Sequence, residues 1–386
     1  MTFDLPFSVI IVGAGNINFG SPEGPWNHST RLEAKLGVRL VVAAIVDPAT
    51  AHAKRQLEVK RGSAAAASYA STLIFSSIAA AHAGLDSPPD LVVLGSPAAF
   101  RGTTDESSGN DAEVQLSRMF PTAAIFVEKP VGAGPVEEPR AVGQHLESVG
   151  SLVSVGYMLR YSAAVQKMKQ IIQDNNLAIM MTSARYVMGA YEFSAKPAWW
   201  NKAIDCGPIV EQATHFCDLS RYFGGEVVLG SIAANSVEWY EAPGRLSKIS
   251  VDETLIPEEQ RIPRFTSATW KYANGAIGHL EHGVALQGTA FSTEFTVWAD
   301  GYQLKLVDPY NHPTLYLRRP GNDAEEIIHF DGDDPFLSEM AAVIERIEGA
   351  DTPILSSYAD AVKTYEMTWA IRWASERSRV PNGIAN

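Results

Sequence analysis

The sequence predicts an α/β protein with a doubly wound parallel sheet at its N-terminal end, followed by an α+β domain with a large, mainly antiparallel, open sheet. Three observations predict this fold class. Short apolar runs alternate with helix-like segments over residues 1–156, a glycine-rich turn follows the first run, and strand-like segments then follow one another closely. Uninterrupted apolar runs are typical of parallel strands that are buried on both faces.

Each expected parallel strand is followed by a segment that can form a crossover helix, which is the rhythm of βαβ units. The strands are Phe7–Val12, Leu40–Val46, Leu73–Phe75, Leu91–Leu94, Ile125–Val127 and Leu152–Val155. The helices between them are Thr30–Leu36, Ala49–Arg61, Ser77–Ala83, Asp111–Phe120 and Glu137–Ser148. We therefore expect a first domain over residues 1–156.

The rest of the chain, residues 157–386, is expected to form the second domain. Its predicted helices are Tyr161–Ile172, Ile209–Phe223, Pro335–Ile347 and Tyr358–Ser375. Its clearest strands are Met180–Val187, Ile277–Ala285, Phe291–Trp298 and Tyr302–Val307. Turn residues between the later strands indicate hairpins and hence antiparallel pairing. Helices can cover one face of such a sheet, and a second copy of the chain can cover the other, so we expect a homodimer or homotetramer.

Composition narrows the class of partner. The 386 residues contain 31 Lys and Arg against 44 Asp and Glu, a formal charge of −13. Such a surface repels nucleic acids and anionic membranes. No apolar run approaches the roughly 18–20 residues of a membrane span. The two cysteines, Cys206 and Cys217, cannot form a disulfide framework. We expect a cytoplasmic protein that acts on a small molecule.

The turn Gly13-Ala-Gly15-Asn-Ile-Asn18 follows the first strand directly. A glycine at its first position allows a tight turn, and a second lets the backbone approach a pyrophosphate. This arrangement predicts dinucleotide binding, and a plain strand-to-loop turn is the alternative. Asn18 stands where such fingerprints have Gly or Ala.

Asp47 ends the second strand, where a carboxylate can accept both ribose hydroxyls of an adenosine and repel a 2′-phosphate. It therefore favours NAD over NADP, although Lys54 and Arg55 nearby keep NADP possible. An Asp-Pro turn without a ligand is the alternative.

Glu128-Lys129-Pro130 follows the fifth strand, at the edge of the sheet where open α/β sheets bind ligands. A lysine there can polarise a substrate oxygen. A surface salt bridge is the alternative.

Glu211, His215 and Asp218 have helical spacing and are expected on one face of a helix. A carboxylate one turn from a histidine can orient it as the base that alcohol oxidation needs, whereas the alternative is a pair that stabilises the helix. We expect no metal site: Glu-x-x-x-His is not a zinc motif, and His279 and His282 point to opposite faces of a strand.

The aromatic loop before this helix holds Trp199 and Trp200, whose rings can bind the apolar face of a sugar, and Glu192 and Lys202, which can bind hydroxyls. Packing in the core or against another subunit is the alternative. We interpret Cys206 as a packing residue.

In this order and spacing, these motifs resemble the Gfo/Idh/MocA family of NAD(P)-dependent oxidoreductases over nearly the whole chain. The motifs are Gly-x-Gly after the first strand, Glu-Lys-Pro after the fifth, Gly156-Tyr-Met-Leu-Arg160-Tyr161 at the domain junction, and the helix with Glu211, His215 and Asp218. The resemblance implies a Rossmann domain and an α/β domain whose open sheet often makes dimer contacts.

The resemblance also implies residue roles. Lys129 would lie beside the nicotinamide and the substrate hydroxyl, His215 would be the acid/base, and Glu211 would stand where the family commonly has Asp. The implied cofactor residues are Gly13, Gly15, Asn16, Ile17, Asp47, Ser96, Pro97, Glu128 and Lys129. The expected substrate residues are Tyr157, Arg160, Trp199, Trp200 and Asp218. Asn18 departs from the family pattern, as does Ser96-Pro97-Ala-Ala-Phe100, which lacks the usual histidine.

The sequence therefore predicts an enzyme that transfers hydride between NAD, or NADP, and a carbinol or carbonyl carbon of a sugar, polyol or related cyclic alcohol. One alternative uses bound NAD for transient oxidation in epimerisation, elimination or glycoside cleavage. A second alternative is a regulatory binding protein that has lost catalytic activity. Such a protein would not need Lys129 and His215.

Overall fold

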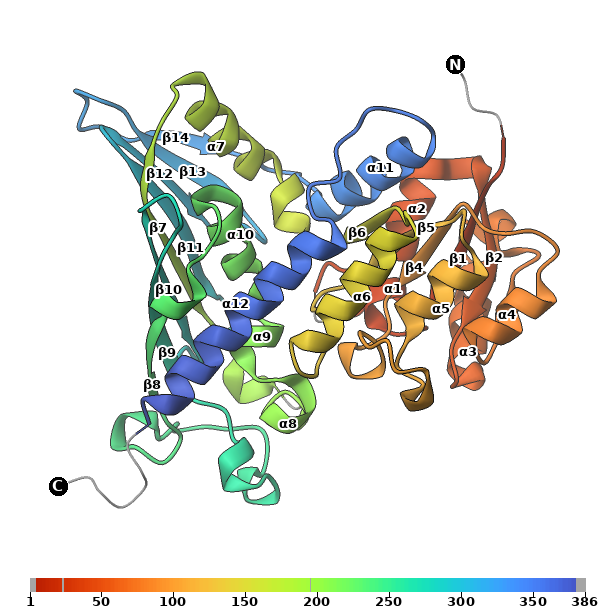
Figure 1. Cartoon of the computed structure of the whole chain (residues 1–386), viewed down its shortest axis with the longest axis horizontal. Coiled ribbons are helices and arrows are strands. Elements are labelled where there is room, and N and C mark those ends of the chain that lie inside the picture. The colour runs from red at the N-terminus through yellow and green to blue at the C-terminus, as the bar shows by residue number, and fades with distance from the viewer. Residues whose placement is uncertain (1–4, 23, 195, 380–386) are drawn as a thin grey trace. The chain divides into compact units, whose positions relative to one another are not determined.

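The computed structural model describes residues 5–22, 24–194 and 196–379 (Figure 1). The described chain divides into two units. The first unit holds the residues up to Tyr161 together with Asp334–Val362, and the second holds Ser162–Asp333 and the residues from Lys363 onward. Among the described residues, no helix is both long and apolar enough to cross a membrane.

The first unit is built on a six-stranded parallel sheet in the order β3-β2-β1-β4-β5-β6. The strands are β1 (Phe7–Val12), β2 (Leu40–Val46), β3 (Leu73–Phe75), β4 (Leu91–Leu94), β5 (Ala124–Val127) and β6 (Val153–Val155). The helices are α1 (Asn16–Phe19), α2 (His28–Leu36), α3 (Thr50–Arg61), α4 (Ile78–Gly84), α5 (Ala112–Met119) and α6 (Glu137–Ser148). The predicted doubly wound sheet is confirmed. Its strand order reverses between β1 and β4, which is where such sheets bind ligands.

The helix α11 (Pro335–Ile347) belongs to the first unit, although it is distant in sequence. Its residues Met340, Val343 and Ile344 are buried in one apolar cluster with Leu32 and Leu36 of α2. Burial of this apolar face against α2 holds the segment in place. The structure thus differs from the expected division at residue 156, because a later segment completes the first core.

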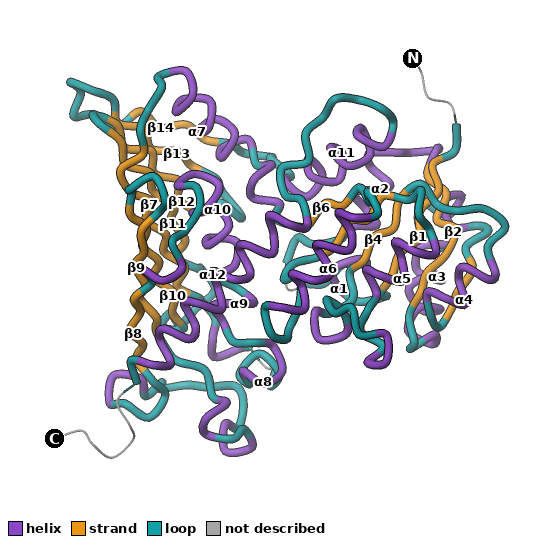
Figure 2. The backbone as a smooth tube through the Cα atoms, in the orientation of Figure 1, coloured by secondary structure: helices purple, strands orange, loops and turns teal. Residues whose placement is uncertain are grey.

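The second unit contains an eight-stranded sheet in the order β14-β13-β12-β11-β7-β10-β9-β8 (Figure 2). The strands are β7 (Ile179–Val187), β8 (Ala233–Val237), β9 (Phe265–Lys271), β10 (Ile277–Gly283), β11 (Ser292–Ala299), β12 (Tyr302–Val307), β13 (Thr314–Arg318) and β14 (Glu326–His329). Only β7 and β10 pair in parallel, so the predicted mainly antiparallel sheet is confirmed.

Helices cover one face of this sheet, with α10 (Thr214–Gly224) against β7 and β10, and α7 (Ala163–Asp174) against β12. The other helices are α8 (Lys202–Asp205), α9 (Pro208–Glu211) and α12 (Tyr358–Arg377), which begins in the first unit and continues into the second. On the opposite face, Trp298 and Ile277 lie in register with Met181 and are exposed. An assembly of copies through this face stays a prediction.

The expected single helix Ile209–Phe223 is wrong, because the chain forms α9 and then α10. The amides of Gln212 and Ala213 both donate to the Pro208 carbonyl, at 3.0 and 2.9 Å. This double use of one acceptor interrupts the helical repeat, and α10 begins again at Thr214. Glu211 and His215 therefore lie on different helices.

Candidate functional site

The glycine turn lies at the carboxyl end of β1. Gly13 has a φ of +93°, and its amide donates to the Val46 carbonyl at 2.8 Å. A Cβ at this position would lie 2.9 Å from the Ser96 nitrogen, whereas a Cβ on Gly15 would meet no atom within 4 Å. Gly13 is therefore needed for the close crossing of two loops, and Gly15 leaves exposed backbone that a phosphate can approach.

Asn18 explains how the turn keeps its shape without the third glycine. The side chain is fully buried, and Nδ2 donates to the carbonyls of Val12 and Gly13 at 3.2 and 2.7 Å. Because these carbonyls end β1, Asn18 ties the first turn of α1 to the end of the strand. The following segment is fixed by Asn27, which accepts from the Thr30 amide as the N-cap of α2 and donates to the Phe19 carbonyl.

Asp47 binds the same turn from the end of β2. One carboxylate oxygen accepts from the Ala14 amide and the other from the Ala49 amide, both at 2.7 Å. Each oxygen retains a lone pair, so the half-buried carboxylate can still accept a ribose hydroxyl. The predicted Gly13, Gly15, Asn16, Ile17 and Asp47 thus come together at one edge of the sheet, and they fit a dinucleotide.

A buried network joins the loops after β4 and β5. Arg101 donates from Nε to the Ser96 carbonyl at 2.9 Å, from a terminal nitrogen to the Glu128 carbonyl, and pairs with Glu113 at 3.4 Å. Burial raises the pKa of Glu113 despite the attraction of Arg101. Sequence reasoning missed both residues, although the arginine lies only four residues after Pro97. Ser96 itself is half-buried, and Pro97 is exposed.

Glu128 is buried at the end of β5 and does not form a surface salt bridge. Its Oε1 lies 2.6 Å from Nε2 of His28, and its Oε2 accepts from the Lys129 amide at 3.1 Å. Burial alone would raise the pKa of Glu128. The hydrogen bond from His28 and the charges of His28, Lys129 and Arg101 outweigh burial and lower the pKa. Lys129 is the next residue after Glu128, whose position these contacts fix, and it is half-buried.

In the second unit, His215 lies half-buried in the first turn of α10, next to a cluster of aromatic side chains. The ring of Tyr310, from the loop between β12 and β13, meets the His215 ring edge to face at 6.2 Å. Tyr310 also meets Tyr186 at 6.0 Å, and Tyr186 packs against Phe216 at 5.5 Å. Sequence reasoning missed Tyr310 and Tyr186, whose positions follow from strand pairing and not from any local motif.

Parallel pairing of β7 and β10 places Tyr186 opposite His282, and their rings stack at 5.5 Å. His282 is buried and its Nε2 lies 2.8 Å from the side-chain oxygen of Gln212, whereas His279 lies on the other face near Ser183 and Ser267. The predicted opposite orientation of the two histidines is confirmed. Burial lowers the pKa of His282 to about 3, so the ring is neutral at physiological pH.

This burial makes a testable contribution to acid stability. Unfolded His282 binds a proton below pH 6.5, and the folded residue does so only near pH 3, so the free energy of unfolding falls as the pH drops through this window. We expect His282→Gln to reduce the slope by up to ~1.4 kcal/mol per pH unit. Urea unfolding of both proteins at a series of pH values measures the two slopes, and equal slopes would contradict the burial of a neutral His282.

Glu211 ends α9, whereas His215 and Asp218 lie on α10, so the three residues are not on the single helix that we expected. Its carboxylate accepts from the indole nitrogen of Trp199 at 3.2 Å. Burial, followed by the charge of Glu211, raises the pKa of Tyr186, and burial, Tyr186 and Glu211 raise the pKa of Tyr310. The negative charge of Glu211 therefore helps to keep the phenols of Tyr186 and Tyr310 protonated.

Three of the residues expected to bind substrate, Tyr157, Arg160 and Asp218, are buried. Arg160 donates to the Leu355 carbonyl and pairs with Asp360 at 2.6 Å, and Asp218 accepts from the Thr364 hydroxyl at 3.0 Å. Tyr157 is 1% exposed. The motif positions carried no information about this burial, and a substrate role for the three residues stays a prediction.

Trp199 and Trp200 belong to an apolar cluster with Met188, Tyr191 and Val284, and Trp200 is fully buried. The alternative interpretation, packing in the core, is therefore confirmed for these rings. The Trp200 indole nitrogen donates to the Ser194 carbonyl at 3.0 Å, so its polar atom is also used internally. Of the two, Trp199 contacts a candidate site residue, through its bond to Glu211.

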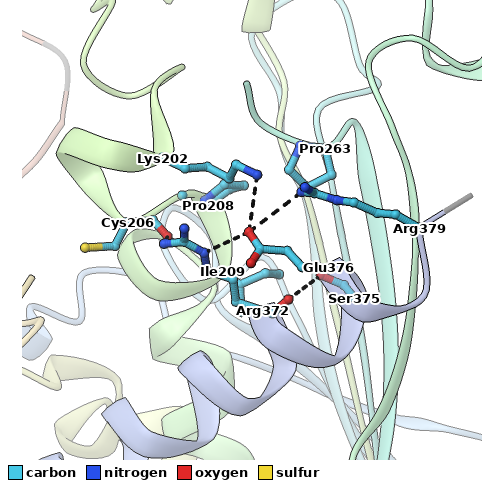
Figure 3. A pocket seen from close by; sticks show the side chains of 10 residues that line it. Lys202, Cys206, Pro208, Ile209, Pro263, Arg372, Ser375, Glu376 and Arg379 are labelled. Carbon is cyan, nitrogen blue, oxygen red and sulfur yellow. Dashed lines mark hydrogen bonds and ion pairs between the residues drawn. The ribbon is translucent and has the colours of Figure 1, made fainter. Parts of the chain in front are cut away.

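Lys202 lines a pocket in which three cationic side chains converge on Glu376 (Figure 3). Its ammonium lies 3.2 Å from Glu376, and Arg372 and Arg379 lie at 3.1 and 3.7 Å. Burial, with repulsion from Arg379, lowers the pKa of Lys202. The residue is therefore part of an internal ion cluster. Cys206 in the same pocket is buried, and burial raises the pKa of its thiol to about 11, as expected for a packing residue.

Comparisons with known proteins agree with this architecture. The family model "Oxidoreductase family, NAD-binding Rossmann fold" (GFO_IDH_MocA) matches residues 7–157, and a model for an oxidoreductase C-terminal domain matches residues 160–302. Two uncharacterised proteins of Schizosaccharomyces pombe, UNK4.17 and C12C2.04, are 46% and 45% identical over 372 and 368 residues. These alignments cover 95% and 94% of this chain and 91% and 95% of the relatives.

Solved structures share the fold at low identity. The WlbA dehydrogenase of Chromobacterium violaceum, in complex with NADH and UDP-GlcNAcA, superposes with a TM-score of 0.72 at 17% identity, covering 98% of this chain and 97% of that one. KijD10, a 3-ketoreductase of Actinomadura kijaniata in complex with NADP, gives 0.66 at 15% identity, with coverage of 96% and 98%. The fold and the two matching family models indicate one and the same family, and the two S. pombe relatives match the chain over nearly its whole length. The chain belongs to the Gfo/Idh/MocA family and is an NAD(P)-dependent oxidoreductase.

Proposed function

We propose that the chain transfers hydride between NAD and a carbinol or carbonyl carbon of a sugar, polyol or related cyclic alcohol. The observation that carries this proposal is Lys129, half-buried at the carboxyl end of β5, in the same sheet whose β1 turn leaves backbone exposed for a pyrophosphate. An ammonium at this edge suits an alcohol or ketone oxygen, because it stabilises the charge that develops there.

His215 is the proton carrier that we propose. A base must remove the hydroxyl proton as a carbinol is oxidised, and a histidine ring can do so near neutral pH. The half-buried ring of Tyr310 lies beside His215 and suits the apolar face of a sugar. We assign Glu211 to the positioning of the aromatic residues near His215, since it bonds to Trp199 and its charge raises the pKa of Tyr186 and Tyr310.

Bound NAD supplies the hydride acceptor at its nicotinamide ring. For its binding we propose the backbone of Gly13, Gly15, Asn16 and Ile17 for the pyrophosphate and Asp47 for the adenosine ribose. The Ser96-Pro97 loop and the Glu128-Lys129 step are proposed for the nicotinamide half. Asp47 favours NAD over NADP because a carboxylate repels a 2′-phosphate, whereas Lys54 and Arg55 are exposed on α3.

Solved structures of the same fold support a sugar-like substrate. Solved structures that share this fold include a UDP-N-acetylglucosamine 3-dehydrogenase of Acidithiobacillus ferrooxidans, with a TM-score of 0.67 at 15% identity, and the 3-ketoreductase KijD10. The first name describes oxidation at one position of a nucleotide sugar, and the second describes reduction of a keto group.

Turnover against a panel of substrates tests the proposal. The purified chain is incubated with NAD or NADP and with myo-inositol, free aldoses, UDP-N-acetylglucosamine or simple diols. We expect the absorbance of reduced nicotinamide to rise with at least one cyclic alcohol, and to rise faster with NAD. Product formation without a net absorbance change would favour transient oxidation instead. Tight NAD binding without turnover of any compound would contradict the proposal.

A further inference from the structure

His28 and Glu128 form a buried pair that the proposed chemistry has not yet used. They are 1% and 6% exposed, and Nε2 of His28 lies 2.6 Å from Oε1 of Glu128. His28 is the first residue of α2, and Glu128 follows β5, so the contact joins positions 100 residues apart. Both residues, and Lys129, belong to the first unit.

Hydrogen bonds fix both the backbone and the side chain of Glu128, the residue before Lys129. Its amide donates to the Leu94 carbonyl at 3.0 Å, and its carbonyl accepts from Arg101. The second carboxylate oxygen accepts from the Lys129 amide at 3.1 Å. A Cβ on Gly156 would lie 3.1 Å from the carboxylate, so this neighbour packs closely against it. The peptide from which the Lys129 side chain extends is therefore fixed by the conformation of Glu128.

A histidine at position 28 lowers the stability of the fold more than an apolar residue that only fills this space. Its Nδ1 is buried and, within the described residues, has no hydrogen-bond partner. The ring meets the edges of Phe126 at 4.9 Å and Phe336 at 6.3 Å, which offer no acceptor or donor. A buried polar atom without a partner costs stability, and a buried carboxylate without a donor costs more. The pair makes sense if the Glu128 carboxylate is needed, because His28 is then the donor that keeps it charged and in place.

We propose that His28 is a positioning residue that, through Glu128, fixes the orientation of Lys129. This inference rests on the proposed function of Lys129 in hydride transfer. The hydrogen bond from His28 directs one carboxylate oxygen toward α2, and the other oxygen is then directed to the Lys129 amide. Without this hydrogen bond, the Glu128 side chain can rotate. The backbone from which the Lys129 side chain extends is then no longer held in one position. Small misplacements of a reacting group reduce catalysis strongly, while ground-state binding changes little.

Three variants of the full chain test this inference: His28→Phe, which keeps a ring without a donor; His28→Gln, whose amide can still donate to Glu128; and Lys35→Gln as a control. Lys35 lies on the same helix and pairs with Glu345 at the surface, away from Glu128. With the best substrate of the panel, we expect His28→Phe to lower kcat about tenfold or more, with KM and the dissociation constant of NAD within about twofold. His28→Gln should recover most of the kcat, and Lys35→Gln should match the natural chain.

A second measurement does not require turnover. The chain without NAD is treated with an acetylating N-hydroxysuccinimide ester, and mass spectrometry follows the labelling rate of Lys129 relative to that of the exposed Lys54. We expect this ratio to change at least about threefold in His28→Phe and to return in His28→Gln, because the reactivity of an amine depends on its surroundings.

The outcomes separate the two proposals. If the natural chain binds NAD and turns over nothing, the proposed function fails, and the labelling ratio alone decides whether His28 positions Lys129. If His28→Phe lowers the melting temperature while kcat and the labelling ratio stay unchanged, His28 is purely structural and the inference is overturned. A folded His28→Gln variant as impaired as His28→Phe would equally overturn it, since the donor would then not matter.

Discussion

Lys129→Met is expected to lower kcat by about a thousandfold, while the dissociation constant of NAD changes by less than about threefold. Methionine has nearly the length of lysine and fills the same space, so the half-buried position at the end of β5 stays packed. What is lost is the cation that we propose stabilises the developing alkoxide. Steady-state kinetics and NAD titration, monitored by the quenching of tryptophan fluorescence, measure the two quantities.

Lys129→Arg is the matched variant for this prediction. It keeps the charge but changes the point ammonium into a broad planar group, so we expect kcat to recover only in part. A Lys129→Met variant with near-normal kcat would show that the lysine has no catalytic role. A variant that no longer binds NAD would indicate that Lys129 serves the cofactor and not the substrate.

His215→Ala is expected to lower kcat by about two to four orders of magnitude, because a general base usually contributes that much. The acid side of the pH profile of kcat should also flatten, since this side reports the group that must be deprotonated. His279→Ala is the control: it removes a histidine from the other face of β10, against Ser183 and Ser267. We expect this control to retain normal turnover.

A chemical rescue experiment sharpens the second prediction. Imidazole or another small amine added to His215→Ala can enter the space that the ring leaves and restore part of the lost proton transfer. If turnover of His215→Ala equals that of the natural chain, or if its pH profile keeps the same acid side, His215 is not the proton carrier.

The parallel sheet was predictable almost residue by residue, and for a physical reason. Its strands are buried on both faces, so Leu91–Leu94 and Ala124–Val127 consist only of apolar residues that stand out against their surroundings. The break between α9 and α10 was not predictable, because the apolar spacing continues through Gln212 and Ala213. The interruption arises from two amides that share the Pro208 carbonyl, a contact without a signal in composition.

Those parts of the candidate site that consist of residues adjacent in the sequence were predictable. The glycine turn and the Glu128-Lys129 step each directly follow a strand, so their positions follow from the strands. Contacts between distant positions were not predictable: the bond of His28 to Glu128, the stack of Tyr186 on His282 and the approach of Tyr310 to His215 depend on how strands and helices pair. For the same reason, the sequence could not reveal that Arg160 and Trp200 are enclosed in the protein.

The return of α11 to the first unit affects how this protein is made. During synthesis, residues up to Tyr161 leave the ribosome long before Met340, Val343 and Ile344, which complete their core. Until then the emerging dinucleotide-binding half exposes the apolar side chains of Leu32 and Leu36, the kind of surface on which nascent chains aggregate and chaperones act. The nucleotide-binding half is thus a discontinuous domain, and it can be completed only after most of the other half has been translated.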